Sequence, residues 1–335
     1  PTEFRWLGAI VPADQVPAWT PETINQFDQD DIYVEMTFLK TLQTYGLGVS
    51  TQQAGIDFAN SRYPLWHANE AARKRLREGI APPDSGHPAF NDHADDIDYQ
   101  IEADFSGLIA PGLPNTAIRL GETFGRLMNY GDGLYGGWFV GAMYSEAFFE
   151  TDPVKIVRAG LAAIPEGSQY HECIADVLAW HAEHPDDWEA AWRKIDDKYQ
   201  KNPAYRRFSC SKDDKDPYKL NIDAKINGAY IAMGLLYGEG DPEKTIVVST
   251  RCGQDSDCNP SNAAGVLFTA LGASRLPAKY TSALDEKTKF NSTDYTFPDI
   301  LAVCDDLAAQ AVVQAGGRIE KSGDGSETFV IPVEA

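Results

Sequence analysis

Apolar residues recur at helical spacing along most of this chain, and this periodicity most constrains how it can fold. Stripes of this kind follow residues 151–153 and 185–187, and residues 229–237 are apolar on nearly every side. Such patterns predict amphipathic helices around a buried central helix. Strand signals are few, and the best flank a Gly- and Ser-rich turn within residues 317–331. The sequence therefore predicts an all-α, compact multi-helix bundle with a small C-terminal β-hairpin.

Composition favours one large domain over residues 1–335, because hydrophobic residues make up 43% of the chain and no linker divides it. The net charge of −21 opposes binding to nucleic acid or to an anionic membrane. No apolar run approaches the roughly 20 residues of a membrane span. Five dispersed cysteines indicate free thiols and a cytoplasmic location, although a secreted protein that has lost its signal peptide stays an alternative.

Two carboxylates stand one residue apart at Asp255 and Asp257, directly before a run of small residues. Because Asn259 can cap a helix and Pro260 suits its first position, we expect the helix to begin there, with both acids in the preceding loop. In an extended segment this spacing aims both side chains the same way, and hard divalent cations need several such oxygen ligands. Taken alone, the pattern is also typical of turn-forming residues.

A second acidic cluster occupies residues 28–31 and precedes another predicted helix, over residues 32–42. Gly46 suits the end of that helix. Carboxylates again stand at a helix N-terminus. This repetition favours a metal site over the alternative that the acids only form turns.

Both segments resemble the ADP-ribosylglycohydrolase family, through DQDDIYVEMTFLKTL at residues 28–42 and GQDSDCNPSNAAGVLFTALGA at residues 253–273. Residues 101–112 and 130–150 are also similar to a branch of this family. Its members carry a Ser/Thr-Asp-Asp triplet early in the chain and a D-x-D-Thr/Ser-Asn motif late. By this resemblance the motifs fall on Gln29, Asp30 and Asp31, and on Asp255, Asp257 and Cys258.

Three departures from the family pattern accompany the match. Gln29 replaces a hydroxyl residue, but its amide oxygen can still bind a hard cation. Cys258 replaces the other hydroxyl, and sulfur is a soft ligand that Mg²⁺ does not prefer. Members also open with a G-x-x-x-G-D-A-x-G helix, which this chain does not show after Pro1. Either that segment precedes the sequence or this branch lacks it.

The resemblance implies a metal-dependent hydrolase that cleaves the C1″ glycosidic bond of an ADP-ribosyl group or a related ribofuranoside. It implies two Mg²⁺ ions, with Mn²⁺ as a possible replacement. The implied ligands are Asp30, Asp31, Asp255 and Asp257, with Gln29 and Cys258 in adjacent ligand positions. Asp257 or Asp30 is the expected catalytic base. The partner would be a small-molecule or ADP-ribosylated substrate, and no pattern indicates an oligomeric state.

Further candidates concern substrate binding. Glu102 and Asp104 lie either on a solvated helix face or against a substrate hydroxyl. Gly131 and Gly133 are expected to let the backbone approach a sugar or phosphate, before a helix over residues 137–149. Asn259, beside the second motif, completes this set.

Two alternative functions stay open. A glycosidase of this type can act on a carbohydrate or nucleoside furanoside, since loops determine the substrate. The replacements at Gln29 and Cys258 are also compatible with a homologue that binds ligand without catalysis.

Overall fold

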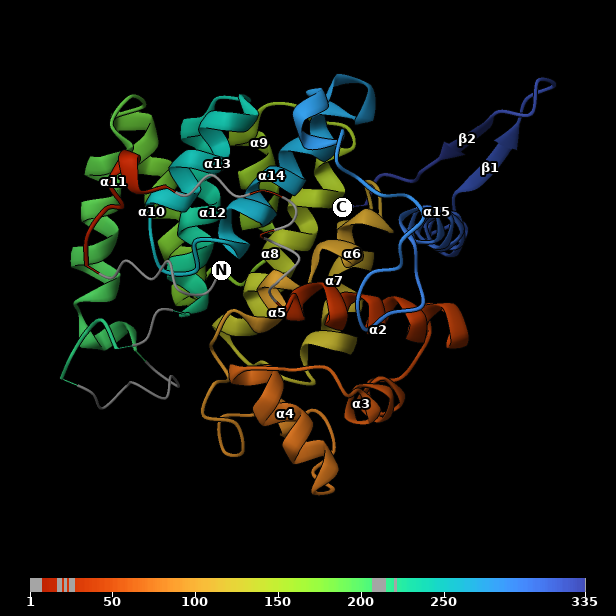
Figure 1. Ribbon diagram of the computed structural model, residues 1–335, viewed down its shortest axis with the longest axis horizontal. Helices are drawn as coiled ribbons and strands as arrows, with labels where there is room; N and C mark the ends of the chain where they lie inside the picture. The colour runs from red at the N-terminus through yellow and green to blue at the C-terminus, as the bar shows by residue number, and fades with distance from the viewer. Residues whose placement is uncertain are drawn as a thin grey trace.

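The computed structural model describes residues 8–16, 20, 23, 28–206, 215–219 and 222–334. Within these residues the chain forms fourteen α-helices and one two-stranded sheet (Figure 1). The α-helices are α2 (Asp30–Tyr45), α3 (Thr51–Asn60), α4 (His67–Arg77), α5 (Asp98–Ile101), α6 (Asp104–Leu108), α7 (Pro114–Gly125), α8 (Asp132–Ala147), α9 (Pro153–Ala162), α10 (Gln169–Glu183), α11 (Trp188–Ile195), α12 (Ala224–Gly238), α13 (Pro242–Arg251), α14 (Cys258–Leu271) and α15 (Phe297–Gln314).

A terminal hairpin completes the regular structure. Strand β1 (Arg318–Lys321) pairs antiparallel with β2 (Glu327–Val330), and the hairpin extends away from the helices beside α15 (Figure 1). The all-α prediction with a C-terminal hairpin is therefore confirmed. Short helical turns of 3₁₀ or π type are η1 (Ala13–Gln15), η2 (Asp84–Gly86), η3 (Asp196–Gln200), η4 (Pro203–Tyr205), η5 (Ala273–Arg275) and η6 (Ala278–Tyr280).

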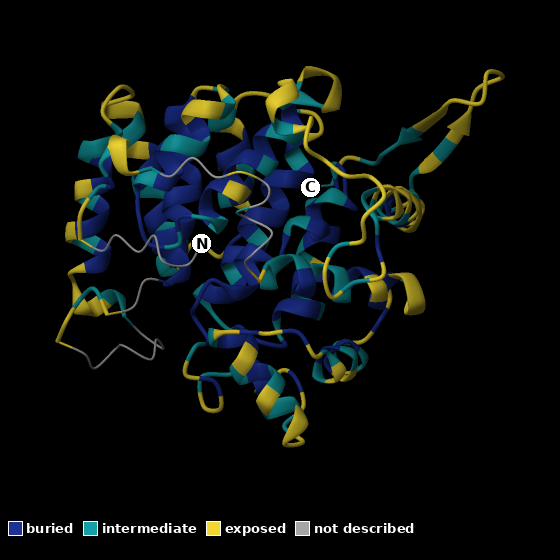
Figure 2. Cartoon of the chain, in the orientation of Figure 1, coloured by how far each residue is buried: buried dark blue, intermediate teal, exposed yellow. Residues whose placement is uncertain are grey.

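Helices α8 and α12 form the centre of the molecule, and Figure 2 shows them almost entirely buried. Every residue of α12 is buried, because its apolar and small side chains surround the helix rather than form one stripe. It packs against α8, α10, α13 and α14. The Asp223 side chain caps α12 by accepting hydrogen bonds from the Lys225 and Ile226 backbone amides. The predicted central helix at residues 229–237 is confirmed and extends one turn further toward its N-terminus.

Three predicted helix starts are displaced toward the N-terminus. Helix α2 begins at Asp30 rather than at residue 32, and α8 begins at Asp132 rather than at residue 137. Helix α14 begins at Cys258, with Asp257 in the N-cap position that we predicted for Asn259. The Ser261 amide donates to the Asp257 carbonyl and so closes the first turn early. The acidic first turns of α2 and α8 agree with the preference for negative charge at a helix N-terminus.

Residues 78–96 are polar and rich in turn residues, so the sequence predicts a surface loop there, and this prediction is only partly correct. The last residues of this segment, Asp95 and Asp96, are buried. They are covered because residues 95–97 pair with residues 222–224, through Ile97 N to Ile222 O and Ala224 N to Asp95 O. The polar residues 201–221 also predict a surface loop, and residues 207–214 and 220–221 of it lie outside the described residues. None of the described helices combines the length and apolarity needed to cross a membrane.

Candidate functional site

The two acidic motifs come together although they lie far apart in the sequence. One is the start of α2, and the other is the loop that connects α13 to α14 (Figure 1). The charge of Asp257 contributes to raising the pKa of both Asp30 and Asp31, and the charge of Asp30 contributes to raising the pKa of Asp255. Such mutual effects require that the carboxyl groups lie within a short distance of one another.

On the α2 side of the site, Gln29 occupies the N-cap position and Asp30 and Asp31 follow in the first turn. All three are half-buried. Burial, followed by the charges of Asp31 and Asp98, raises the pKa of Asp30 to about 8. Burial is also the main reason that the pKa of Asp31 rises to about 6. Both carboxyls are therefore held in an environment that disfavours uncompensated negative charge.

On the α14 side, Asp255, Asp257 and Cys258 each offer one ligand atom, and these atoms lie within 4.8 Å of one another. The Asp255 Oδ2 atom is buried and has no hydrogen-bond partner among the described residues. Burial and the neighbouring Asp257 charge raise the pKa of Asp255 well above its usual range. Burial and the same two acids also raise the pKa of Cys258, so its sulfur is a neutral thiol near pH 7.

A buried amide network sets the shape of this loop. Asn227, on α12, accepts hydrogen bonds at Oδ1 from the Asp255 amide at 3.2 Å and from Asn259 Nδ2 at 2.8 Å. Its Nδ2 donates to Gln254 Oε1 at 3.1 Å. Gly253 and Gln254 both have positive φ, at 86° and 56°, so the chain turns sharply just before Asp255. We did not predict roles for Asn227 or Gln254, although a polar side chain beside the all-apolar residues 229–237 was a signal for Asn227.

The donor set fits a divalent cation. Four partly buried carboxyl groups interact electrostatically, and at least one buried oxygen, on Asp255, lacks a hydrogen-bond partner among the described residues. Clustered buried carboxylates are costly in free energy unless a positive charge compensates them. Oxygen donors of this kind suit Mg²⁺ and Mn²⁺, whereas the single thiol of Cys258 adds one soft donor.

A comparison with protein families decides the class of this chain. Residues 1–316 match the model of the ADP-ribosylglycohydrolase family. The chain belongs to the ADP-ribosylglycohydrolase family. No curated protein matches it individually. Membership supports a glycohydrolase in general terms, and the roles of single residues stay predictions.

Glu102 and Asp104 were predicted to bind the substrate of this glycohydrolase. Their surroundings in the structure differ from each other. Glu102 is fully buried and accepts a hydrogen bond from Asn69 Nδ2, so the solvated-face alternative is wrong for it. Asp104 accepts at Oδ2 from Tyr144 OH at 2.6 Å and at Oδ1 from Asn262 Nδ2 at 2.7 Å. These two bonds connect α6 to α8 and α14, so the geometry favours a structural role for Asp104.

Replacing Tyr144 by phenylalanine should lower the free energy of unfolding by about 1–3 kcal/mol, because the buried Asp104 carboxyl loses a donor. Urea unfolding measures this loss. Tyr237→Phe is the matched control, since Tyr237 is also buried but its hydroxyl has no partner in the described structure. Equal stability of the two variants would contradict the structural role of the Tyr144–Asp104 bond.

The predicted glycines separate into two kinds. Gly131 has a φ of 55° and lines a cavity of about 280 Å³. Gly133 is packed instead, because a Cβ atom there would lie 2.5 Å from the Ala94 carbonyl oxygen. Asn259 is fully buried, and its Nδ2 is bonded to Asn227. The cavity is lined by Asp95, Tyr130, Gly131, Asp132, Tyr135, Pro165, Gly167, Ser168, Gln169 and Lys225.

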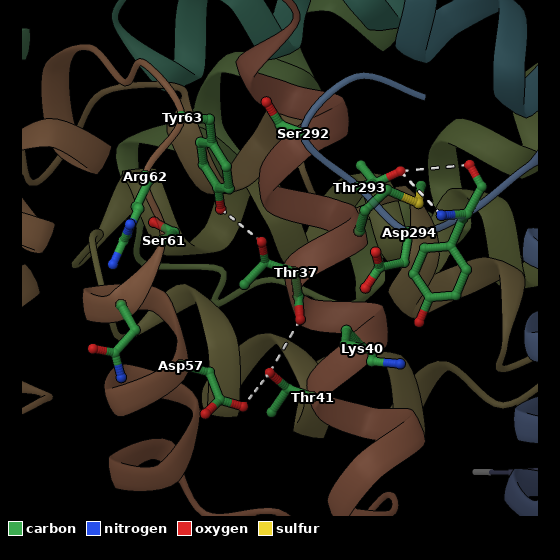
Figure 3. Close-up of a pocket in the computed structure, with 13 residues that line it drawn as sticks. Thr37, Lys40, Thr41, Asp57, Ser61, Arg62, Tyr63, Ser292, Thr293 and Asp294 are labelled. Carbon is green, nitrogen blue, oxygen red and sulfur yellow. Dashed lines mark hydrogen bonds between the residues drawn. The ribbon is translucent and has the colours of Figure 1, made fainter. Parts of the chain in front are cut away.

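A further cavity, of about 470 Å³, opens along α2 beyond the acidic residues. Figure 3 shows Thr37 and Thr41 pointing from α2 toward Tyr63 and Asp57. Thr37 Oγ1 shares a hydrogen bond of 2.8 Å with Tyr63 OH, and Thr41 Oγ1 donates to Asp57 Oδ2 at 2.8 Å. None of the predicted metal or catalytic residues lines this cavity, and these inner hydroxyls already have protein partners. This cavity is therefore separate from the predicted metal and catalytic residues.

Replacing Cys258 by serine should tighten Mg²⁺ binding on the order of tenfold, or about 1.4 kcal/mol, because a hard oxygen replaces sulfur beside Asp255 and Asp257. Wild-type protein should correspondingly accept Mn²⁺ comparatively well. Isothermal titration measures both affinities, and a melting curve is the control for folding. A lower melting temperature with unchanged Mg²⁺ affinity would show that Cys258 serves packing and does not bind the cation.

Proposed function

We propose that this glycohydrolase cleaves the C1″ glycosidic bond of an ADP-ribosyl group, or of a related ribofuranoside, in a Mg²⁺-dependent reaction. The observation that supports it best is the meeting of the two acidic motifs in a chain whose family is that of ADP-ribosylglycohydrolases. Neither motif alone supplies enough ligands for a hard cation.

The cation ligands would be Asp30, Asp31, Asp255 and Asp257, with Gln29 and Cys258 beside them. When bound, two divalent cations would orient the ribose diol, stabilise charge in an oxocarbenium-like transition state and lower the pKa of a water molecule. The oxygen-rich side chains agree with this chemistry, as does the buried Asp255 oxygen that has no hydrogen-bond donor among the described residues.

A carboxylate side chain of the protein would accept the proton of the attacking water. The oxygen of the attacking water would form the new bond to C1″ while the bond to the leaving group breaks, and a carboxylate would take one proton of that water. The leaving group would keep the electron pair of the broken bond and take up a proton. Asp257 and Asp30 are our candidates for this base. For Asp30, a pKa raised to about 8 by burial and neighbouring acids agrees with proton exchange near neutral pH.

The cavity beside Gly131 is our candidate for the remainder of the substrate. Asp95 lines this cavity, and Asp98 lies three residues further along the chain. The charge of Asp98 contributes to raising the pKa of Asp30, so the cavity is connected to the acidic site through this segment. Two tyrosines, Tyr130 and Tyr135, provide aromatic surface there. We therefore keep Gly131, which lines this cavity, as a candidate for substrate contact, and not Gly133, which is packed against Ala94.

A substrate panel tests the proposal. Purified protein is incubated with ADP-ribosylated peptides and with aryl furanosides, with Mg²⁺ or with a chelator, and released ADP-ribose or phenol is measured. We expect Mg²⁺-dependent release of ADP-ribose. Turnover of the furanosides alone would favour the carbohydrate or nucleoside alternative. Binding of ADP-ribose in a titration with no release from any substrate would favour a homologue without catalysis.

A further inference from the structure

A third group of acids lies beside the two motifs, on and after the short helix α5. Asp98 is 4% exposed and Glu102 is 0% exposed. Helix α5 packs against α4, α8 and α14 (Figure 1), so it has little contact with solvent. Ionisable side chains are almost never this deeply buried unless a partner or a metal compensates them.

One asparagine holds both carboxyl groups. The backbone amide of Asn69, in the first turn of α4, donates to Asp98 Oδ1 at 2.8 Å, and Asn69 Nδ2 donates to Glu102 Oε1. The other oxygens, Asp98 Oδ2 and Glu102 Oε2, are buried and have no hydrogen-bond partner in the described residues. Each carboxyl thus has one fixed oxygen and one available oxygen. Hydrogen bonds that orient a ligand from behind are a regular feature of metal sites.

Both carboxyls are close to the first motif. The charge of Asp98 contributes to raising the pKa of Asp30, and the charges of Asp98 and Asp30 both contribute to raising the pKa of Glu102. The neighbouring cationic groups are engaged elsewhere, since Lys225 Nζ pairs with Asp223 Oδ2 at 2.6 Å.

His93, whose charge lowers the pKa of Asp98, is hydrogen-bonded through Nδ1 to Asp96 Oδ2. His93 therefore compensates part of the Asp98 charge, but neither Asp98 Oδ2 nor Glu102 Oε2 has a hydrogen-bond partner in the described part of the chain.

We propose that Asp98 and Glu102 are further ligands of the cation site formed by the two acidic motifs, and that Asn69 is the residue that positions them. This inference rests on the proposed metal-dependent function. It adds a third segment to the site, from the middle of the chain. Two available carboxylate oxygens beside Asp30 are hard donors of the type that Mg²⁺ and Mn²⁺ bind.

The test compares Asp98→Asn and Glu102→Gln with the wild type in the full chain. Mn²⁺ affinity is measured by isothermal titration, and the melting temperature is measured without metal. If both acids are ligands, each variant should bind Mn²⁺ about tenfold or more weakly. Its metal-free melting temperature should stay equal or rise, because the amide replaces a buried carboxyl group whose ionised form is costly without a metal. Asn69→Ala should weaken Mn²⁺ binding too, while all carboxyl ligands remain present.

Asp196→Asn is the matched control. Asp196 is also 4% exposed, but its carboxylate pairs with Lys201 Nζ at 2.8 Å and accepts from Tyr218 OH at 3.2 Å. This variant should lose stability and keep its Mn²⁺ affinity. Wild-type affinity in Asp98→Asn and Glu102→Gln, or unfolding of either one without metal, would overturn the inference and leave the proposed function standing. A wild-type protein that binds no Mn²⁺ would overturn both.

Discussion

Asp257→Asn should lower kcat by about 100-fold or more, because it removes a negative charge that faces the cation and one of the two candidate bases. The amide keeps the shape of the side chain, so the N-cap position of α14 is disturbed little. The measurement is kcat at saturating Mg²⁺, on whichever substrate of the panel is turned over. Saturation with Mg²⁺ separates lost chemistry from weakened metal binding.

Asp57→Asn is the control for this prediction. Asp57 is half-buried like Asp257, but it lies in the cavity along α2 and accepts hydrogen bonds from Thr41 and Gln53. Its replacement should leave turnover unchanged. If Asp257→Asn matched the wild type in rate, Asp257 would be a loop residue only, and the candidate base would be Asp30.

Mg²⁺ affinity should rise by up to about tenfold per pH unit between pH 6 and pH 8, or about 50-fold in total. The pKa of Asp30 in the metal-free protein is raised to about 8 by burial, by Asp31 and by Asp98. Below pH 8 the cation must therefore displace a proton, and metal binding becomes weaker as the pH falls. Titration of Mg²⁺ at pH 6, 7 and 8 measures the effect.

The raised pKa of Asp30 also determines how the stability of the metal-free protein changes with pH. Since the folded-state pKa of Asp30 lies above the ordinary value of 3.8, its protonation stabilises the metal-free fold at low pH. That contribution is lost as the pH rises from about 4 through about 8, and bound Mg²⁺ should restore the stability at the upper end. Asp30→Asn should flatten both pH profiles. Equal Mg²⁺ affinity at pH 6 and pH 8 in the wild type would contradict the assignment.

Helical periodicity and capping residues predicted the type of most elements, because these signals act over a few neighbouring residues. The central position of α12 followed from its apolar residues on all sides, and the terminal hairpin followed from alternation around a turn. Helix starts were less accurate. At α14 the Asn259-Pro260 pair suggested a start, but the Ser261 amide donates to the Asp257 carbonyl, and the helix begins two residues earlier than expected.

The sequence by itself determined the family resemblance and the two acidic segments, each placed before a helix. Only the tertiary structure decided which other groups face them. Asn227 fixes the loop of the second motif from α12, and Asn69 holds Asp98 and Glu102 from α4. Whether a carboxylate is a solvated surface group or a buried ligand candidate depends on what covers it, and that cover comes from elements far away in the chain. For this reason spacing identified Asp255 and Asp257, whereas the buried oxygens of Asp98 and Glu102 could be recognised only once the helices were packed.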